Sequence, residues 1–87
     1  MPGAERDLDY LPPERRERIL KRLVLFRDLD GALPGIPLSG DLRGMCKLRF
    51  GRYRLVYDEA NNGALMRIWA VGHRSHIYET VRRRAKQ

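Results

Sequence analysis

Three cations alternate along a stretch that the sequence predicts to be a β-hairpin. In residues 45–58, MCKLRFGRYRLVYD, apolar and basic residues alternate with the two-residue period of a strand on both sides of Gly51-Arg52. A two-residue turn with glycine first sets Arg49 opposite Arg54, with Lys47 on the same face. Like charges in direct opposition cost the fold roughly a few tenths of a kcal/mol, so the cluster favours a polyanionic ligand. The alternative interpretation is that these three long side chains simply extend into water.

The next predicted turn, Asn62-Gly63, sorts the strands into two unlike faces. It sets Asp58 opposite Arg67, a favourable pair that supports the register. One face is apolar and predicted to pack on helices; it holds Leu48, Phe50, Tyr53, Leu55, Tyr57, Ile68 and Ala70. The other face combines cations with an aromatic side chain, an arrangement that binds single-stranded nucleic acid; it holds Lys47, Arg49, Arg54 and Arg67 around Val56 and Trp69. The alternative interpretation is that Trp69 is covered by a partner or by the ends of the chain.

Arg74 and Tyr78 lie where the sequence predicts the entry to a last helix. A tyrosine acts as a general base when neighbouring cations favour its phenolate, and arginines hold the charge that grows on a phosphate during displacement. With Lys47, Arg49 and Arg54, these residues have the chemistry to cleave RNA through its own 2′-hydroxyl. The two histidines and one cysteine lack the spacing of a common metal site, and no glycine loop suits a phosphate. We therefore expect no metal and no cofactor.

Length and charge restrict the class of protein. The 87 residues predict one small domain over residues 1–87. Of the net charge of +7, none comes from residues 1–30, where seven cations balance seven acids; residues 31–87 carry eleven cations against four acids. Such a field favours nucleic acid, although an acidic protein partner also suits it. A single cysteine, Cys46, excludes a disulfide within the chain, and no apolar run is long enough for a membrane span, so we expect a cytoplasmic protein.

The remaining segments predict helices at both ends of the chain. Residues 4–10 form a short helical piece, and an amphipathic helix follows over residues 14–28, with a solvated basic face; its apolar set is Ile19, Leu20, Leu23, Val24 and Phe26. Residues 31–44, rich in proline and glycine, form a long surface connection. Residues 46–72 give three antiparallel strands. Ser75 is expected to cap a last helix that buries Ile77 and Val81.

The blocks LSGDLRGMCKLRFGRYRLVY and AVGHRSHIYETV resemble the RelE/ParE family of bacterial type II toxins. The family pattern is LxGxxxGxxKLRxGxYRxxY followed by VGHRxxVY, and the resemblance extends from about residue 8 to residue 84. It implies an α+β fold: a small antiparallel β-sheet with two N-terminal helices packed on one face and a short C-terminal helix. It also implies a cognate antitoxin as partner, in a toxin-antitoxin hetero-oligomer, with a disordered part of the antitoxin ordering on the toxin.

The resemblance implies two alternative activities. RelE-type toxins are ribosome-dependent mRNA endonucleases that need no metal, whereas ParE-type toxins poison DNA gyrase. The RelE pattern transfers to four catalytic positions: Lys47 and Tyr78 activate the 2′-hydroxyl, Arg54 stabilises the phosphorane-like charge, and Arg74 assists the leaving oxygen. Arg49, Arg67 and Trp69 are the expected RNA contacts, with the ribosome and mRNA as partners. The presence of Tyr78 favours the nuclease.

The chain departs from the family pattern at two places. Family members begin with a strand of the type YxVxFxPxA, but this chain begins MPGAERDLDYLP, so the sequence predicts a three-stranded sheet with an unpaired edge. Some RelE-type members carry a second lysine where this chain has Met45. A trimmed, inactive toxin that only binds the antitoxin is therefore a third possibility.

Overall fold

The computed structural model describes residues 2–28, 35–60 and 65–86. These residues form three helices and a four-stranded antiparallel sheet, so the fold is α+β as predicted. In chain order the elements are α1 (Pro2–Tyr10), α2 (Pro13–Asp28), β1 (Ile36–Pro37), the 3₁₀ turn η1 (Gly40–Leu42), β2 (Cys46–Phe50), β3 (Tyr53–Ala60), β4 (Leu65–His73) and α3 (Ile77–Ala85). The sheet order is β1-β2-β3-β4. No helix in the described ranges is both long enough and apolar enough to cross a membrane.

The two N-terminal helices lie within two residues of their predicted bounds. Pro13 occupies the first position of α2, where its missing N–H is not needed. Ile19 is 1% exposed and Leu23 is half-buried, as the helical spacing predicted. Leu20 was placed in the same apolar set, and that placement is wrong because its side chain is 44% exposed. Only a narrow stripe of α2 therefore faces the sheet.

The hairpin at the centre of the chain has its predicted geometry. Gly51 has a φ of +64°, which an L side chain rarely adopts, so glycine is required at the first turn position. Arg49 pairs with Arg54 and Asp58 with Arg67. The strand count was wrong: β1 adds a two-residue strand that pairs with Lys47 and Cys46, so the sheet has four strands rather than three. The predicted Asn62-Gly63 turn lies outside the described residues.

A β-bulge in the last hairpin changes which side chains share a face. The pairing of β3 with β4 shifts by one residue between Val56 and Tyr57, so Val56 pairs with Ala70 and Tyr57 with Ile68. Trp69 is the extra residue. The prediction that Ala70 shares the apolar face of Ile68 was therefore wrong, because a bulge reverses the alternation beyond it. Ala70 packs beside Val56 instead.

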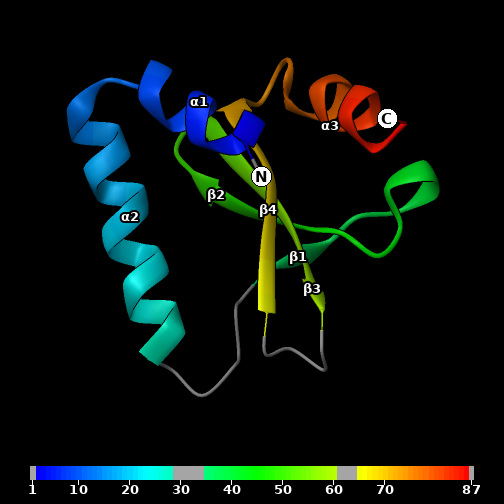
Figure 1. Cartoon of the computed structure of the whole chain (residues 1–87), viewed down its shortest axis with the longest axis horizontal. Helices are drawn as coiled ribbons and strands as arrows, with labels where there is room; N and C mark the ends of the chain where they lie inside the picture. Colours follow the sequence, from blue (N-terminus) through cyan, green and yellow to red (C-terminus); the bar gives the residue numbers. More distant parts are fainter. Residues whose placement is uncertain (1, 29–34, 61–64, 87) are drawn as a thin grey trace.

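Helices lie on both faces of the sheet (Figure 1), and each face carries a core of buried side chains. The first core, under α1 and α2, is built from Leu11, Ile19, Leu48, Phe50, Leu55, Tyr57 and Val71. The second core, which we call the α3-side core, consists of Leu42, Val56, Ala70, Ile77 and Val81, with Leu38, Met45, Trp69 and Tyr78 packed against it. The basic face expected to be open is thus largely covered by α3 and η1. We call it the α3 face.

The last helix begins differently from its prediction. His76, not Ser75, occupies the N-cap position, and it makes no side-chain capping bond. The Ser75 hydroxyl lies 2.8 Å from His73 Nδ1, and the Ser75 N–H donates to the same nitrogen at 3.2 Å. Ser75 therefore closes a local turn after β4. Ile77 and Val81 are 1% and 0% exposed, as predicted.

Candidate active site on the α3 face of the sheet

The amine of Lys47 and the phenol of Tyr78 meet on the α3 face. Lys47 comes from the middle of β2 and Tyr78 from the first turn of α3, and both are half-buried. Lys47 Nζ lies 5.7 Å from the centroid of the Tyr78 ring, within the range of a cation–π interaction. The strand fixes the lysine because Lys47 pairs with the fully buried Val56. Two of the four predicted catalytic residues are therefore in contact.

Arg54 is a buried cation on the same face. It lies two residues from Val56 along β3, so the two side chains point to the same side. The side chain is 8% exposed, and its Nη1 donates to the carbonyl oxygens of Gly51 at 2.8 Å and Tyr53 at 2.9 Å. Among the described residues no carboxylate lies within ion-pair distance of Arg54. A guanidinium has five N–H donors, so donors remain available for an anion.

Arg49 and Arg74 lie at the same end of the sheet as Arg54. Arg49 is exposed and pairs directly with Arg54 across the ladder. The backbone N–H of Arg74 donates to the carbonyl of Arg52 at 2.9 Å, which fixes the segment after β4 against the hairpin turn. The Arg74 side chain is exposed. The structure thus brings these arginines to the hairpin end, with cationic side chains on both strands and on the turn that follows β4.

Arg67 lies apart from this cluster. Its partner Asp58 is four residues from Arg54 along β3, or roughly 13 Å at the rise of a strand. The guanidinium binds the Asp58 carboxylate in a two-pronged arrangement, with Nε donating to Oδ1 at 2.8 Å and Nη2 donating to Oδ2. These hydrogen bonds raise the pKa of Arg67 further above its ordinary value. The predicted pairing of Asp58 with Arg67 is confirmed, and it satisfies the charge that was predicted to bind RNA.

Trp69 is not an open stacking platform. Its side chain is half-buried and packs against the α3-side core, and its indole Nε1 is buried without a hydrogen-bond partner among the described residues. The alternative interpretation, cover by the chain ends, describes this position, because α3 is the C-terminal element. Strand alternation placed Trp69 on this face correctly, but it carries no information on the helix that covers the indole.

Two exposed arginines of α2, on the face predicted to be solvated, also lie over aromatic rings of the hairpin. Arg15 Cζ lies 4.9 Å from the centroid of Tyr53, and Arg22 Cζ lies 5.5 Å from that of Phe50. Arg22 Nη1 also donates to the Arg49 carbonyl at 3.4 Å. Their seven-residue spacing on one helix face, opposite aromatic residues that flank a turn, could have indicated this packing.

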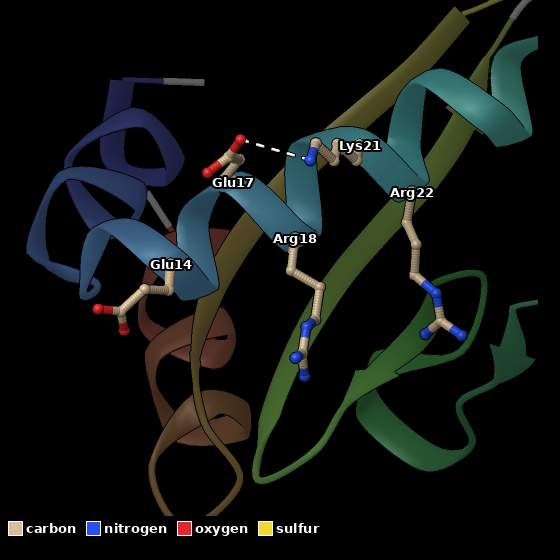
Figure 2. A pocket seen from close by; sticks show the side chains of 5 residues that line it. All are labelled: Glu14, Glu17, Arg18, Lys21 and Arg22. Carbon is tan, nitrogen blue, oxygen red and sulfur yellow. Dashed lines mark ion pairs between the residues drawn. The ribbon is translucent and has the colours of Figure 1, made fainter.

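A groove of about 320 Å³ runs along the outer side of α2. Figure 2 shows its lining, with Arg18 and Arg22 extending on one side of the helix and the ion pair of Glu17 with Lys21 on another. The groove belongs to the helix that covers the first core, on the opposite face of the sheet from Lys47 and Tyr78. Its charges of both signs are mostly solvated, so we do not place the active site there.

In the described ranges, no three His, Cys, Asp or Glu side chains gather as a metal site would require. His73 is occupied with Ser75, and Cys46 is a free thiol beside the first core. The side chains that meet on the α3 face are an amine, a phenol and guanidinium groups. The arrangement can take up a proton, bind an anion and stabilise added negative charge.

This fold and this set of side chains define a small α+β protein with cationic side chains gathered on one face of its sheet. Residues 1–78 match the family model described as the ParE toxin of the type II toxin-antitoxin system parDE. The chain is 39% identical over 79 residues to Toxin RelG of Mycobacterium tuberculosis, with 86% of each chain covered. It also resembles a chain in the crystal structure of the toxin-antitoxin complex RelBE2 from Mycobacterium tuberculosis, with a TM-score of 0.60, 35% identity and 85% and 91% of the two chains covered.

The family model covers residues 1–78, which contain the first sequence block and most of the second, and each of the other two matches covers 85% or more of the chain. The chain therefore belongs to the RelE/ParE family of type II toxin-antitoxin toxins.

Proposed function

We propose that this toxin is a ribosome-dependent mRNA endonuclease that cleaves through the RNA 2′-hydroxyl. One observation carries the proposal: Arg54 is 8% exposed, without a carboxylate partner in the described structure, on the face where Lys47 meets Tyr78. Burying an unpaired cation costs stability, so a fold that keeps one gains from the anion it binds. A scissile phosphate fits that role, because its charge increases on the way to the transition state.

Each residue has a defined role in the proposed reaction. The Tyr78 oxygen, with Lys47 beside it, removes the proton of the 2′-hydroxyl, and the freed 2′-oxygen attacks the phosphorus. Arg54 donates hydrogen bonds to the equatorial phosphate oxygens as charge accumulates on them. Arg74 donates a hydrogen bond to the 5′-oxygen as its bond to phosphorus breaks, and this oxygen takes up a proton from water. The products are a 2′,3′-cyclic phosphate and a 5′-hydroxyl. Arg49, exposed beside Arg54, binds a neighbouring phosphate.

Arg67 and Trp69 stay predicted RNA contacts of lesser weight. Because Asp58 already holds Arg67 and α3 covers Trp69, we expect their substitution to weaken cleavage less than substitution of Arg54. The ribosome and mRNA are the proposed partners, together with an antitoxin in a hetero-oligomer. The toxin-antitoxin complex found among the similar structures supports the antitoxin. Action on ribosomes implies a cytoplasmic protein, with which the free thiol of Cys46 agrees.

Cleavage of mRNA on programmed ribosomes tests the proposal. The wild type should cut at a defined position, and Tyr78→Phe should slow cleavage about 10²-fold or more because the phenol oxygen is lost as a base. Tyr10→Phe is the matched control, since Tyr10 is 87% exposed on α1 and should leave the rate unchanged. A Tyr78→Phe variant that is folded and as fast as the wild type would contradict the assignment.

Inhibition of DNA gyrase is the second candidate, favoured by the ParE description of the matching family model. Gyrase supercoiling in the presence of the purified toxin separates the two activities. Loss of supercoiling without mRNA cleavage would replace the nuclease by the gyrase poison. If neither activity is found but the protein still binds its antitoxin, the chain is the binding-only toxin.

A further inference from the structure

Helix α3, which carries Tyr78, has little of its own to hold it in place. It has nine residues and no side-chain cap at its N-terminus, and a helix of this length is unstable by itself in water. Its buried side chains, Ile77 and Val81, are four residues apart and so lie on one line along the helix. Two anchors on a line hold the helix against the sheet, but they leave its rotation about that line to other contacts.

A network centred on Asp7 of α1 holds the C-terminal end of α3. The Asp7 carboxylate accepts from Arg84 Nη1 at 2.8 Å and from Nη2 at 3.0 Å. Asp7 Oδ2 also accepts from the backbone N–H of Val71 at 2.9 Å, while Arg84 Nη1 donates to the Trp69 carbonyl at 2.9 Å. The hydrogen bond to Asp7 raises the pKa of Arg84 further above its ordinary value. One ion pair thus joins α1, the outer edge of β4 and α3.

Taken together, the two side chains of this ion pair are less exposed than those of the other ion pairs that the structure describes. The Arg84 and Asp7 side chains are 25% and 16% exposed, against 40% and 78% for the pair of Arg16 with Asp9. Gly3 contributes to the close approach of α1, because a Cβ at this position would lie 2.8 Å from Arg84 Cζ. The guanidinium therefore packs against the α1 backbone where a larger residue would displace it.

A second ion pair holds α3 from its other side. Arg82 Nε donates to Oδ2 of Asp41, in η1, at 2.7 Å. Arg82 is four residues after Tyr78, so the two side chains share a face of α3. Leu42 of η1 belongs to the α3-side core, which keeps the turn against the helix. Figure 1 shows α3 between α1 and the η1 turn. The two ion pairs act on opposite sides of the line through Ile77 and Val81.

We propose that Asp7 and Asp41 are positioning residues for Tyr78. By holding α3 on both sides, their ion pairs fix the rotation of the helix and keep the Tyr78 ring beside Lys47. This inference rests on the proposed nuclease function, because it concerns the geometry of the proposed base. Asp7 has the larger share, since its pair is more buried and has more hydrogen bonds than that of Asp41. The N-terminal helix is thereby part of the active-site support.

Cleavage kinetics on programmed ribosomes separate positioning from binding. Asp7→Asn keeps an acceptor for the Val71 N–H but loses the charge that holds Arg84. It should lower kcat about 10- to 100-fold, because a small misplacement of a reacting group has an effect of that size, and leave KM within about twofold. Asp41→Asn should lower kcat less, and Asp7→Glu should recover part of the loss. Asp9→Asn is the matched control on the same helix and should change neither constant.

Gly3→Ala separates positioning from helix stability. Alanine favours a helix more than glycine, so the helical content of α1 should not fall. The added methyl group nevertheless displaces the Arg84 guanidinium, and kcat should fall severalfold while every charge is kept. Near-ultraviolet circular dichroism of Trp69, the single tryptophan, shows whether each variant is folded. This variant tests the inference even if Asp7→Asn fails to fold.

The outcomes distinguish this inference from the proposed function. If the wild type does not cleave mRNA, the nuclease assignment and the inference built on it both fail. If the wild type cleaves and Tyr78→Phe does not, but Asp7→Asn and Gly3→Ala keep the wild-type kcat, the positioning role alone is overturned. A rise in KM with unchanged kcat would also overturn it, because it would show that Asp7 affects ribosome binding instead.

Discussion

The cations on the α3 face and on α3 itself differ in their partners. Arg67, Arg82 and Arg84 each hold a carboxylate, from Asp58, Asp41 and Asp7. For Lys47 and Arg54 the described structure records no carboxylate, and Arg54 is the most buried of these cations. The paired cations connect elements of the fold. The unpaired cations have no acidic partner to offset the cost of burying a charge, as expected of groups kept for an external anion.

The first test of this difference is to remove a cation that has a carboxylate partner and to measure the change in the free energy of unfolding. Arg84→Met should lower the free energy of unfolding by about 1–3 kcal/mol, because it leaves the largely buried Asp7 carboxylate without its charged partner. Urea denaturation followed by Trp69 fluorescence measures the change. A variant as stable as the wild type would mean that the pair has no structural role.

The two faces of the sheet also differ in their tyrosines, because Tyr57 is buried in the first core and Tyr78 packs against the α3-side core. Alkaline pH tests the contribution of Tyr57 to stability. Burial raises the pKa of Tyr57 to about 12, from an ordinary value of 10.0. Because the folded-state pKa is the higher one, this contribution to stability is complete below about pH 10 and is lost as the pH rises through about 12. The free energy of unfolding of Tyr57→Phe should therefore fall less steeply between pH 10 and 12 than that of the wild type. Parallel curves for the two proteins would contradict the assignment.

Removal of Arg54, which has no carboxylate partner in the described structure, should change the free energy of unfolding in the opposite direction from removal of a paired cation. Arg54→Met replaces a buried guanidinium with an apolar chain of similar length, so the free energy of unfolding should rise by about 1 kcal/mol while cleavage is lost. Thermal and urea denaturation measure the stability. A clear loss of stability would show that the bonds from Arg54 to the Gly51 and Tyr53 carbonyls outweigh its desolvation, which would make Arg54 structural.

The smallest expected effect concerns the exposed pair. Asp58→Asn should lower the free energy of unfolding much less than Arg84→Met does, because the Arg67 side chain is 49% exposed and water replaces much of the attraction. The same denaturation experiment at low and high salt measures it. An effect as large as that of Arg84→Met would show that exposure does not separate the two pairs.

Sequence periodicity accounts for the elements and for most of the site. The turn at Gly51, the pairs of Arg49 with Arg54 and Asp58 with Arg67, and the burial of Ile77 and Val81 follow from local patterns. The β-bulge does not follow from local patterns, because a single inserted residue leaves no periodic trace. It moved Ala70 to the α3 face, whereas the strand alternation had already placed Trp69 there. Residues 36–37 are too short for a recognisable strand pattern.

The contacts of the chain ends were also beyond local patterns. Asp7 and Arg84 are 77 residues apart, and nothing in the spacing of either helix identifies the partner of the other. The sequence also predicted an unpaired sheet edge, because residues 1–12 do not match the strand pattern with which family members begin. In the structure, β4 is an edge strand, and Asp7 binds the Val71 N–H on it. A side chain there does part of what a neighbouring strand would do.

The most direct test compares mRNA cleavage by two variants, Arg54→Gln and Arg67→Gln, on programmed ribosomes. Both variants lose one guanidinium from the same sheet face, and only Arg67 has a carboxylate partner in the described structure. We expect Arg54→Gln to slow cleavage about 10²-fold or more, and the cleavage rate of Arg67→Gln to stay within about threefold of the wild-type rate. Equal losses, or a larger loss at Arg67, would contradict the claim that the unpaired cation binds the reacting phosphate.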